Sequence, residues 1–258
     1  MDAFSIFEPG DGRRIAYHKV PPRGDGVNRP GVVFLGGFKS DMTGTKAQAL
    51  EEWARTEGRA FVRFDYTGHG ASSGQFLDGC IGDWARDARD VLDALTEGPQ
   101  ILVGSSMGGW ISLLVARAMP HRVAGLVGIA AAPDFTEIGM WAAMDEAIRT
   151  QLMEEGQIEE PSEYSDEPYV ITKRLIEDGR TQQVLNQPLV LPFPVRLLHG
   201  TADVDVPMDW PLRLLEHAEC PDMRLLLLKG SDHRLSEPDD LAAIRAAVEE
   251  VTARAQIG

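Results

Sequence analysis

The stretch that decides the fold is Gln100-Ile101-Leu102-Val103-Gly104-Ser105-Ser106-Met107-Gly108-Gly109-Trp110. Its first half is a short, continuously apolar run, which is typical of a strand covered on both faces in a parallel sheet. Its second half opens residues 107–119, which are apolar nearly all round and therefore predict a buried helix. Strand and helix meet at a single sharp turn, and Ser106 stands at its centre.

The same stretch contains the pattern Gly-x-Ser-x-Gly, which occurs twice in the chain. The pattern marks a nucleophilic serine only where a strand leads directly into the turn and a helix leaves directly from it. Gly104 to Gly108 meets both conditions. Gly70 to Gly74 lies several residues beyond its strand and is followed by no helical pattern. We therefore expect Ser106 to be the nucleophile and Ser72 to belong to a glycine-rich loop.

Strands and helices alternate on both sides of this turn. Apolar runs of strand length are found at 31–36, 60–64, 100–104, 123–130, 195–199 and 224–228, and helical spacing at 46–57, 83–95, 107–119 and 236–251. Residues 4–7 and 13–19 alternate more regularly around a Gly10-Asp11-Gly12 turn and predict an antiparallel hairpin at the sheet edge. The order predicts an α/β fold with a doubly wound, mostly parallel sheet.

One segment, residues 134–193, interrupts this alternation. It has helix signals, no strand-like run and a proline-rich exit, and it contains 13 acidic residues against 4 basic ones. We interpret it as a helical lid inserted into a core formed by residues 1–133 and 194–258. Met140, Trp141, Met144, Ile148 and Leu152 would share one side of a lid helix. We expect Trp141 and Met144 to line a substrate pocket, since both suit a flexible apolar ligand.

Composition excludes several classes of protein. The chain has 258 residues, a net charge of −15 and only two cysteines, Cys80 and Cys220. A polyanion is poorly suited to nucleic acid or anionic membrane surfaces, so neither nucleic-acid binding nor membrane insertion is expected. Two cysteines cannot make a disulfide scaffold, and a reducing compartment fits them. The first five residues, Met1 to Ser5, lack the segments of a secretory signal, so a cytoplasmic location is expected.

A serine hydroxyl needs a base, and the base needs an acid to hold its tautomer. His233 is the best candidate for the base, because it lies in a polar loop directly after the last strand. Asp203 follows the preceding strand and is the favoured acid. Asp205 is an alternative two residues further on, and Asp232 is ranked behind both because it adjoins the base itself.

Stabilising a developing oxyanion requires two backbone N–H donors. Met107 follows the nucleophile directly and supplies one amide. The loop Gly36-Gly37-Phe38 follows an early strand, and its glycines allow close approach, so the amide of Phe38 is expected as the second donor. A metal site made of His199, Asp203, Asp232 and His233 is the alternative use of these side chains. They lack the spacing of a metal-binding motif, so neither metal nor cofactor is expected.

These residues resemble the α/β-hydrolase superfamily across nearly the whole chain, through 36–38, 63–72, 104–110, 199–203 and 231–234. A closer resemblance, through 44–47, 98–106, 196–200 and 231–234, is to the abhydrolase-domain palmitoyl-protein thioesterases, which also act as acyl-glucuronide esterases. The resemblance implies a triad of Ser106, Asp203 and His233 and an oxyanion hole of Phe38 and Met107. The chain lacks the Arg- and Ser-rich transit sequence of the mitochondrial relatives, so a bacterial-type cytoplasmic relative is expected.

The sequence therefore predicts a serine hydrolase that cleaves carboxylic esters or thioesters of small-molecule or acylated substrates through an acyl-enzyme. Two other functions compete with it. One is a non-catalytic ligand-binding protein that keeps the pocket of this fold, and the other is a peptidase. The acidic lid also predicts that highly anionic substrates, such as intact acyl-coenzyme A, are disfavoured.

Overall fold

The computed structural model describes residues 4–160 and 169–255. Three parts of the chain lie outside this range: Met1 to Ala3 of the expected signal-free start, residues 161–168 of the expected lid, and the last three residues. Eight strands form one sheet in the order β1-β2-β4-β3-β5-β6-β9-β10. Their bounds are β1 Ser5–Phe7, β2 Ile15–Val20, β3 Val32–Leu35, β4 Phe61–Phe64, β5 Gln100–Ser105, β6 Val123–Ile129, β9 Val195–Gly200 and β10 Met223–Leu228.

The sheet has the predicted mixed character. β1 pairs antiparallel with β2, and β2 pairs antiparallel with β4, at one edge. All other neighbouring pairs are parallel. The predicted edge hairpin and the doubly wound, mostly parallel sheet are therefore confirmed. Because parallel strands end at the same edge, the loops after β3, β5, β6, β9 and β10 all open there.

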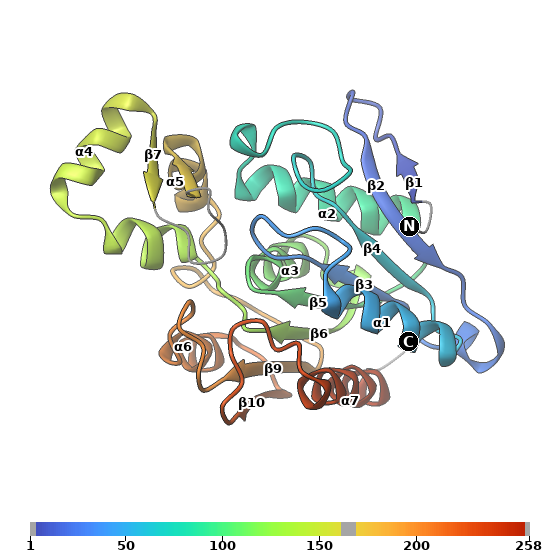
Figure 1. Cartoon of the computed structure of the whole chain (residues 1–258). Coiled ribbons are helices and arrows are strands. Elements are labelled where there is room, and N and C mark those ends of the chain that lie inside the picture. The colour runs from blue at the N-terminus through green and yellow to red at the C-terminus, as the bar shows by residue number, and fades with distance from the viewer. Residues whose placement is uncertain (1–3, 161–168, 256–258) are drawn as a thin grey trace.

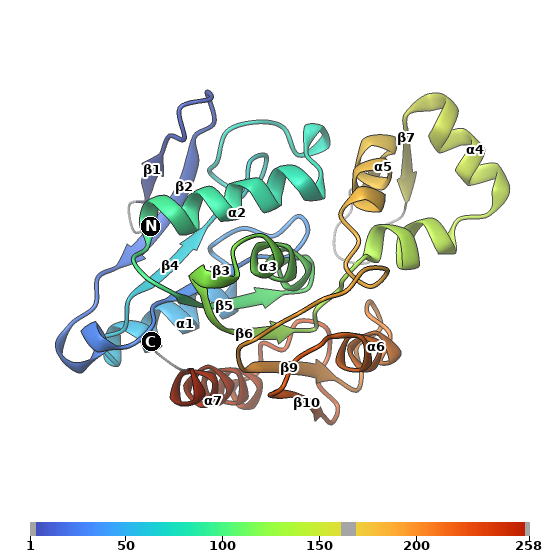
Figure 2. The ribbon, with the colours of Figure 1, turned by 180° about the vertical axis from the view of Figure 1, so that it is seen from behind.

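Helices cover both faces of the sheet (Figures 1 and 2). α1 Thr45–Thr56 and α7 Pro238–Arg254 pack on one face, and α2 Ile81–Leu95, α3 Met107–Ala118 and α6 Asp209–His217 pack on the other. Trp84 of α2 and Trp110 of α3 are fully buried in the second layer. Short 3-10 turns at Gly24–Asn28, Phe76–Asp78 and Pro120–Arg122 complete the connections. These two apolar layers fix the sheet edge at which the loops meet.

The segment between β6 and β9 differs from the prediction in two ways. It contains an antiparallel hairpin, β7 Gln157–Glu160 with β8 Tyr169–Thr172, so the expectation of a purely helical insertion is wrong. The hairpin buries one apolar pair, Ile158 opposite Ile171. β7 has the sequence Gln-Ile-Glu-Glu with a single apolar residue, so the strand is too short to show an alternating pattern in the sequence.

The expected single lid helix is also interrupted. A π-helix covers Thr136–Trp141, and α4 Glu146–Glu155 begins only after Asp145. The Asp145 side chain accepts a hydrogen bond from the amide of Ile148 at 2.8 Å, which is a strong helix start. α5 Lys173–Thr181 follows the hairpin. Figures 1 and 2 show α4, β7 and α5 grouped at one end of the molecule, away from β1 and β2.

Asp134 joins the two ends of this segment to the core. Its buried carboxylate accepts hydrogen bonds from the amides of Val184 at 2.8 Å and Leu185 at 2.9 Å. Burial raises the pKa of Asp134, although both amides oppose the shift. The start of the segment is therefore held against residues 50 positions further along, before the chain returns to the sheet at β9. In the described part of the chain, no helix is both long and apolar enough to cross a membrane.

Candidate active site

Ser106 occupies the turn between β5 and α3 in a backbone conformation that L-residues rarely adopt, with φ 53° and ψ −116°. Its amide donates to the carbonyl of Ile129 at 2.9 Å, and its carbonyl accepts from Gly109 at 2.9 Å. The turn is so tight that a Cβ on Gly104 would lie 2.3 Å from the Gly108 carbonyl oxygen. A Cβ on Gly108 would lie 2.1 Å from the Leu35 carbonyl oxygen. Both glycines of the pattern are thus required by the packing that presents Ser106.

Three side chains from three loops form a continuous hydrogen-bonded line. His233 Nε2 lies 3.1 Å from Ser106 Oγ, and His233 Nδ1 lies 2.9 Å from Asp203 Oδ2. An ionised carboxylate can only accept, so it holds the proton on Nδ1 and leaves Nε2 free to accept from the serine hydroxyl. The structure therefore brings together the three residues predicted as the triad. The arrangement can transfer a proton from the hydroxyl to the imidazole.

Asp203 is held in its position by the chain around it. Its side chain is fully buried, and its Oδ1 accepts from the amides of Val206 at 2.9 Å and Asp205 at 3.0 Å. Burial tends to raise the pKa of Asp203, but the bonds from His233 and these amides outweigh it and leave the pKa below its usual value. The carboxyl group is therefore an anion when it faces the imidazole.

The alternative uses of nearby groups can be compared with this geometry. Asp205 is exposed and lines the cavity. Asp203 supplies the carboxylate oxygen that lies 2.9 Å from His233 Nδ1. Donor atoms of Asp203, Asp205 and His233 lie within 4.8 Å of one another. Two of these residues already bond to each other. His199 Nε2 lies 3.1 Å from the carbonyl oxygen of Val206, and burial lowers the pKa of this imidazole. It is thus a neutral structural residue.

The loop after β3, which contains Phe38, runs close to Ser106. A Cβ on Gly37 would lie 3.5 Å from Ser106 Cβ, so this loop runs directly past the serine. The ring of Phe38 packs edge-on against Phe76 and Phe135, with centroids 4.9 Å and 5.7 Å away. Met107 is the first residue of α3 and is fully buried. The structure therefore places Met107 directly after Ser106 and brings the loop that contains Phe38 next to it; their roles as amide donors stay a prediction.

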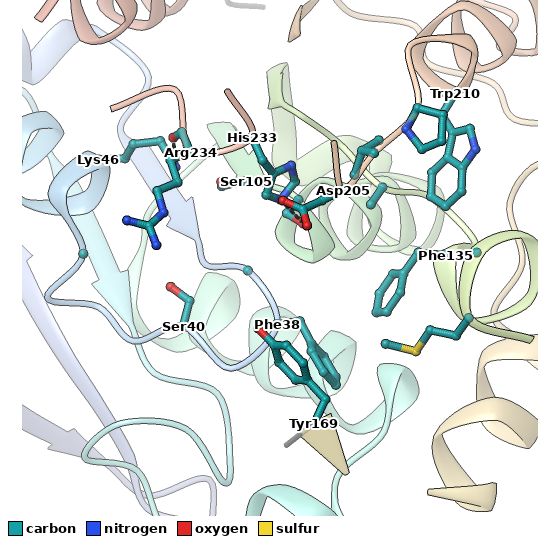
Figure 3. A pocket seen from close by; sticks show the side chains of 18 of the residues that line it. Phe38, Ser40, Lys46, Ser105, Phe135, Tyr169, Asp205, Trp210, His233 and Arg234 are labelled. Atoms are coloured by element: carbon teal, nitrogen blue, oxygen red, sulfur yellow. Dashed lines mark hydrogen bonds between the residues drawn. The ribbon is translucent and has the colours of Figure 1, made fainter. Parts of the chain in front are cut away.

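A cavity of about 850 Å³ opens over this line of residues. Figure 3 shows aromatic side chains on one side of His233, and Lys46, Arg234 and Ser40 on the other. The apolar part comes mainly from the segment between β6 and β9: Phe135, Ile138, Met140, Ala142, Ala143, Tyr169 and Ile171, with Phe38 and Trp210 from the core. No acidic residue of that segment's described part lines the cavity. The expectation that the acidic lid disfavours anionic substrates stays a prediction, because it rests on the net charge of the whole segment and not on the cavity wall.

Trp141 and Met144, the two predicted pocket residues, lie elsewhere. Neither lines the cavity. Met144 is buried in a small core of the lid itself, and the ring of Trp141 packs under Arg149 and Arg180, 5.1 Å and 4.3 Å from their guanidinium carbons. These two side chains therefore stabilise the segment between β6 and β9 and do not form the cavity wall.

Several cavity residues were not predicted from the sequence, and of these Lys46 is distant in sequence from Ser106, Asp203 and His233. Arg234 is next to His233 and could have been suspected. Lys46 falls within the stretch 44–47 that carries the closer resemblance, but no chemical role followed from that stretch, and Trp210 belongs to no motif.

The second Gly-x-Ser-x-Gly match has a structural role. Ser72 Oγ donates to the Asp65 carbonyl at 2.7 Å and accepts from the Ala16 amide at 2.8 Å. The hydroxyl thus links the loop after β4 to β2, and both of its bonds are made to backbone.

Comparison with known proteins identifies the family. Residues 32–255 match the model of the alpha/beta hydrolase family. The chain belongs to the alpha/beta hydrolase family. Among its members, the mitochondrial palmitoyl-protein thioesterase ABHD10 of Rattus norvegicus is 37% identical over 223 residues, covering 86% of this chain and 75% of the rat protein.

Two solved structures are similar along nearly the full length. A crystal structure of a hydrolase from Agrobacterium vitis S4 has a TM-score of 0.91 and 41% identity and covers 97% of this chain and 98% of its own. Alpha/beta hydrolase domain-containing protein 10 from mouse has a TM-score of 0.88 and 34% identity, with coverage of 96% and 97%. The alpha/beta hydrolase fold predicted from the sequence is confirmed.

Proposed function

We propose that this alpha/beta hydrolase is a serine hydrolase that cleaves carboxylic thioesters and esters through an acyl-enzyme. The observation that carries the proposal is the hydrogen-bonded line from Ser106 through His233 to the buried Asp203, placed at a cavity with a large apolar part. The names of the relatives, palmitoyl-protein thioesterases, favour a long acyl chain on a thioester.

The first half of the reaction forms the acyl-enzyme. Ser106 Oγ attacks the acyl carbon while its proton passes to His233 Nε2, and the carbonyl oxygen becomes an oxyanion. The amides of Met107 and Phe38 donate to this oxyanion. The tetrahedral intermediate then breaks the bond between the acyl carbon and the leaving sulfur or oxygen. His233 Nε2 returns the proton to the leaving group.

The second half of the reaction releases the acid. Water loses a proton to His233 Nε2 and attacks the acyl carbon. Ser106 Oγ departs and regains that proton. Asp203 stays ionised throughout and stabilises the imidazolium that forms twice in each cycle.

The acyl chain and the leaving group of the substrate occupy different parts of the cavity. We propose that residues 134–193 act as a lid whose described apolar residues hold the acyl chain. The leaving group then lies towards Lys46 and Arg234. Each buried methylene contributes about 0.8 kcal/mol, so transition-state binding through this wall raises kcat/KM by up to about fourfold per carbon.

Hydrolysis of a graded series tests the proposal. Acyl thioesters and oxygen esters from two to sixteen carbons are compared, with Ser106→Ala as the matched blank. We expect rates that rise from acetyl to medium chains and a blank without enzymatic turnover. Faster cleavage of peptide amides than of thioesters would indicate a peptidase. Ligand binding without any turnover would indicate a non-catalytic binding protein.

We also propose a cytoplasmic location, although the curated relatives are named as mitochondrial. Cys80 and Cys220 are free thiols, as a reducing compartment favours. Fractionation of the source cells, with detection of the native protein, tests this location.

A further inference from the structure

The loop that presents His233 is fixed firmly on the side that precedes the histidine. The amide of Gly230 donates to Thr201 Oγ1 at 2.9 Å, and the carbonyl of Ser231 accepts from Ala202 at 3.0 Å. Ser231 Oγ bonds to Asp240 of α7 at 2.5 Å. These contacts hold the loop to the chain that follows β9 and to α7, before the chain reaches His233.

The side that follows the histidine is a turn under strain. Asp232 Oδ1 accepts from the amides of Arg234 at 3.0 Å and Leu235 at 3.2 Å. Leu235 is fully buried and has φ 43°, a conformation that costs free energy in a bulky residue. The carbonyl oxygen of Arg234 accepts a hydrogen bond from Nζ of Lys46, which belongs to α1.

Lys46 is an unusual residue for its position. It lies in the first turn of α1, where a cation opposes the helix dipole, and its side chain is half-buried. Burial lowers its pKa to about 8, while Asp232 and Asp240 favour the ammonium form and Arg234 disfavours it. Helix stability therefore does not explain a lysine here. Its ammonium group instead bonds to the residue that directly follows His233.

We propose that Lys46 is a positioning residue for His233: by holding the Arg234 carbonyl, it keeps the imidazole within hydrogen-bond distance of Ser106. The inference rests on the proposed function, because positioning matters only if His233 is the base. Displacement of a reacting group by about 1 Å can cost about 100-fold in rate. The 3.1 Å separation between His233 Nε2 and Ser106 Oγ leaves little room for such a displacement.

The test compares Lys46→Met with Lys46→Arg, and uses Lys229→Met as the matched control. Lys229 lies at the start of the same loop, is exposed and does not line the cavity. Three quantities are measured at pH 7: the rate of Ser106 labelling by a fluorophosphonate, and kcat and KM for a neutral acetyl ester. For Lys46→Met we expect labelling and kcat to fall about 10- to 100-fold with KM nearly unchanged. Lys46→Arg and Lys229→Met should stay close to wild type.

A pH series adds a readout that a purely structural role would not move. Wild-type kcat should decline as pH rises through about 8, because Lys46 loses its proton and donates more weakly. Lys46→Arg should lack this decline, because a guanidinium keeps its charge. This arm remains decisive if Lys46→Met fails to fold.

Hydrogen exchange of residues 229–237 separates the two proposals. Faster exchange in Lys46→Met than in Lys229→Met would show that Lys46 holds the loop of His233, whether or not the protein turns over substrate. Labelling and exchange equal to wild type in Lys46→Met would overturn it. So would a rise in KM confined to anionic substrates, which would make Lys46 a substrate-binding cation. Absence of labelling in wild-type protein would refute the proposed function alone.

Discussion

Replacing Asp203 by asparagine should reverse the tautomer of His233 while leaving its position intact. The side-chain oxygen of the new asparagine must keep accepting from the amides of Val206 and Asp205, which lie 2.9 Å and 3.0 Å from Oδ1. The new amide nitrogen then faces His233 Nδ1, where a carboxylate oxygen lies 2.9 Å away in the native protein. A donor at that point forces Nδ1 to accept, so the proton moves to Nε2 and points at Ser106 Oγ.

An imidazole with its proton on Nε2 cannot accept the serine proton. In serine hydrolases this change costs about 10⁴ in kcat, equivalent to about 5 kcal/mol of transition-state stabilisation. Steady-state kcat for a medium-chain thioester measures the loss, and circular dichroism checks the fold. Asp205→Asn is the matched control, because Asp205 contributes its amide to this arrangement and the substitution preserves that amide. A larger loss in Asp205→Asn than in Asp203→Asn would refute the reasoning.

Substitutions elsewhere should separate the nucleophile, the second serine motif and the acyl pocket. Ser106→Ala and His233→Ala should each lower kcat by a factor on the order of 10⁶, because triad members act as a unit. Both variants should unfold at nearly the native temperature, and a large fall in that temperature would point to misfolding instead. Ser72→Ala should keep most activity but lose about 1–2 kcal/mol of unfolding free energy, because the substitution leaves the Ala16 amide without its hydrogen bond. Urea denaturation measures this loss, and labelling of Ser72 by a serine-directed probe would contradict its structural role. Met140→Trp should depress hydrolysis of long acyl chains more than acetyl turnover, whereas Trp141→Ala, outside the cavity, should leave the chain-length slope unchanged; equal slopes in both variants would remove the acyl-pocket interpretation.

Elements that bury a continuous apolar run could be predicted from the sequence. β5 and α3 meet at Ser106 because Ile101, Leu102 and Val103 are followed directly by a helix that is apolar all round. The positions of His233 and Asp203 followed from the same logic. Each comes just after a strand, and parallel strands end at one edge of the sheet.

Features that depend on contacts between distant segments could not be predicted. The hairpin of β7 and β8 is stabilised by Ile158 against Ile171, and neither strand is long enough to show a period. Trp141 and Met144 lie away from the cavity because they pack within the segment itself, Met144 in its small apolar core and Trp141 against Arg149 and Arg180. Lys46 meets Arg234 across 188 positions of sequence, and no local pattern reports such a contact.

Trapping the acyl-enzyme tests the proposed mechanism most directly. The protein is mixed with a medium-chain acyl thioester, quenched in acid within the first turnovers, digested and analysed by mass spectrometry. We expect one acyl group on the peptide that contains Ser106 and none in Ser106→Ala. In His233→Ala, incubated for longer so that it acylates slowly, we expect a larger fraction of that peptide to carry the acyl group. An acyl group found on another residue, or thioester turnover by Ser106→Ala at the wild-type rate, would contradict the mechanism.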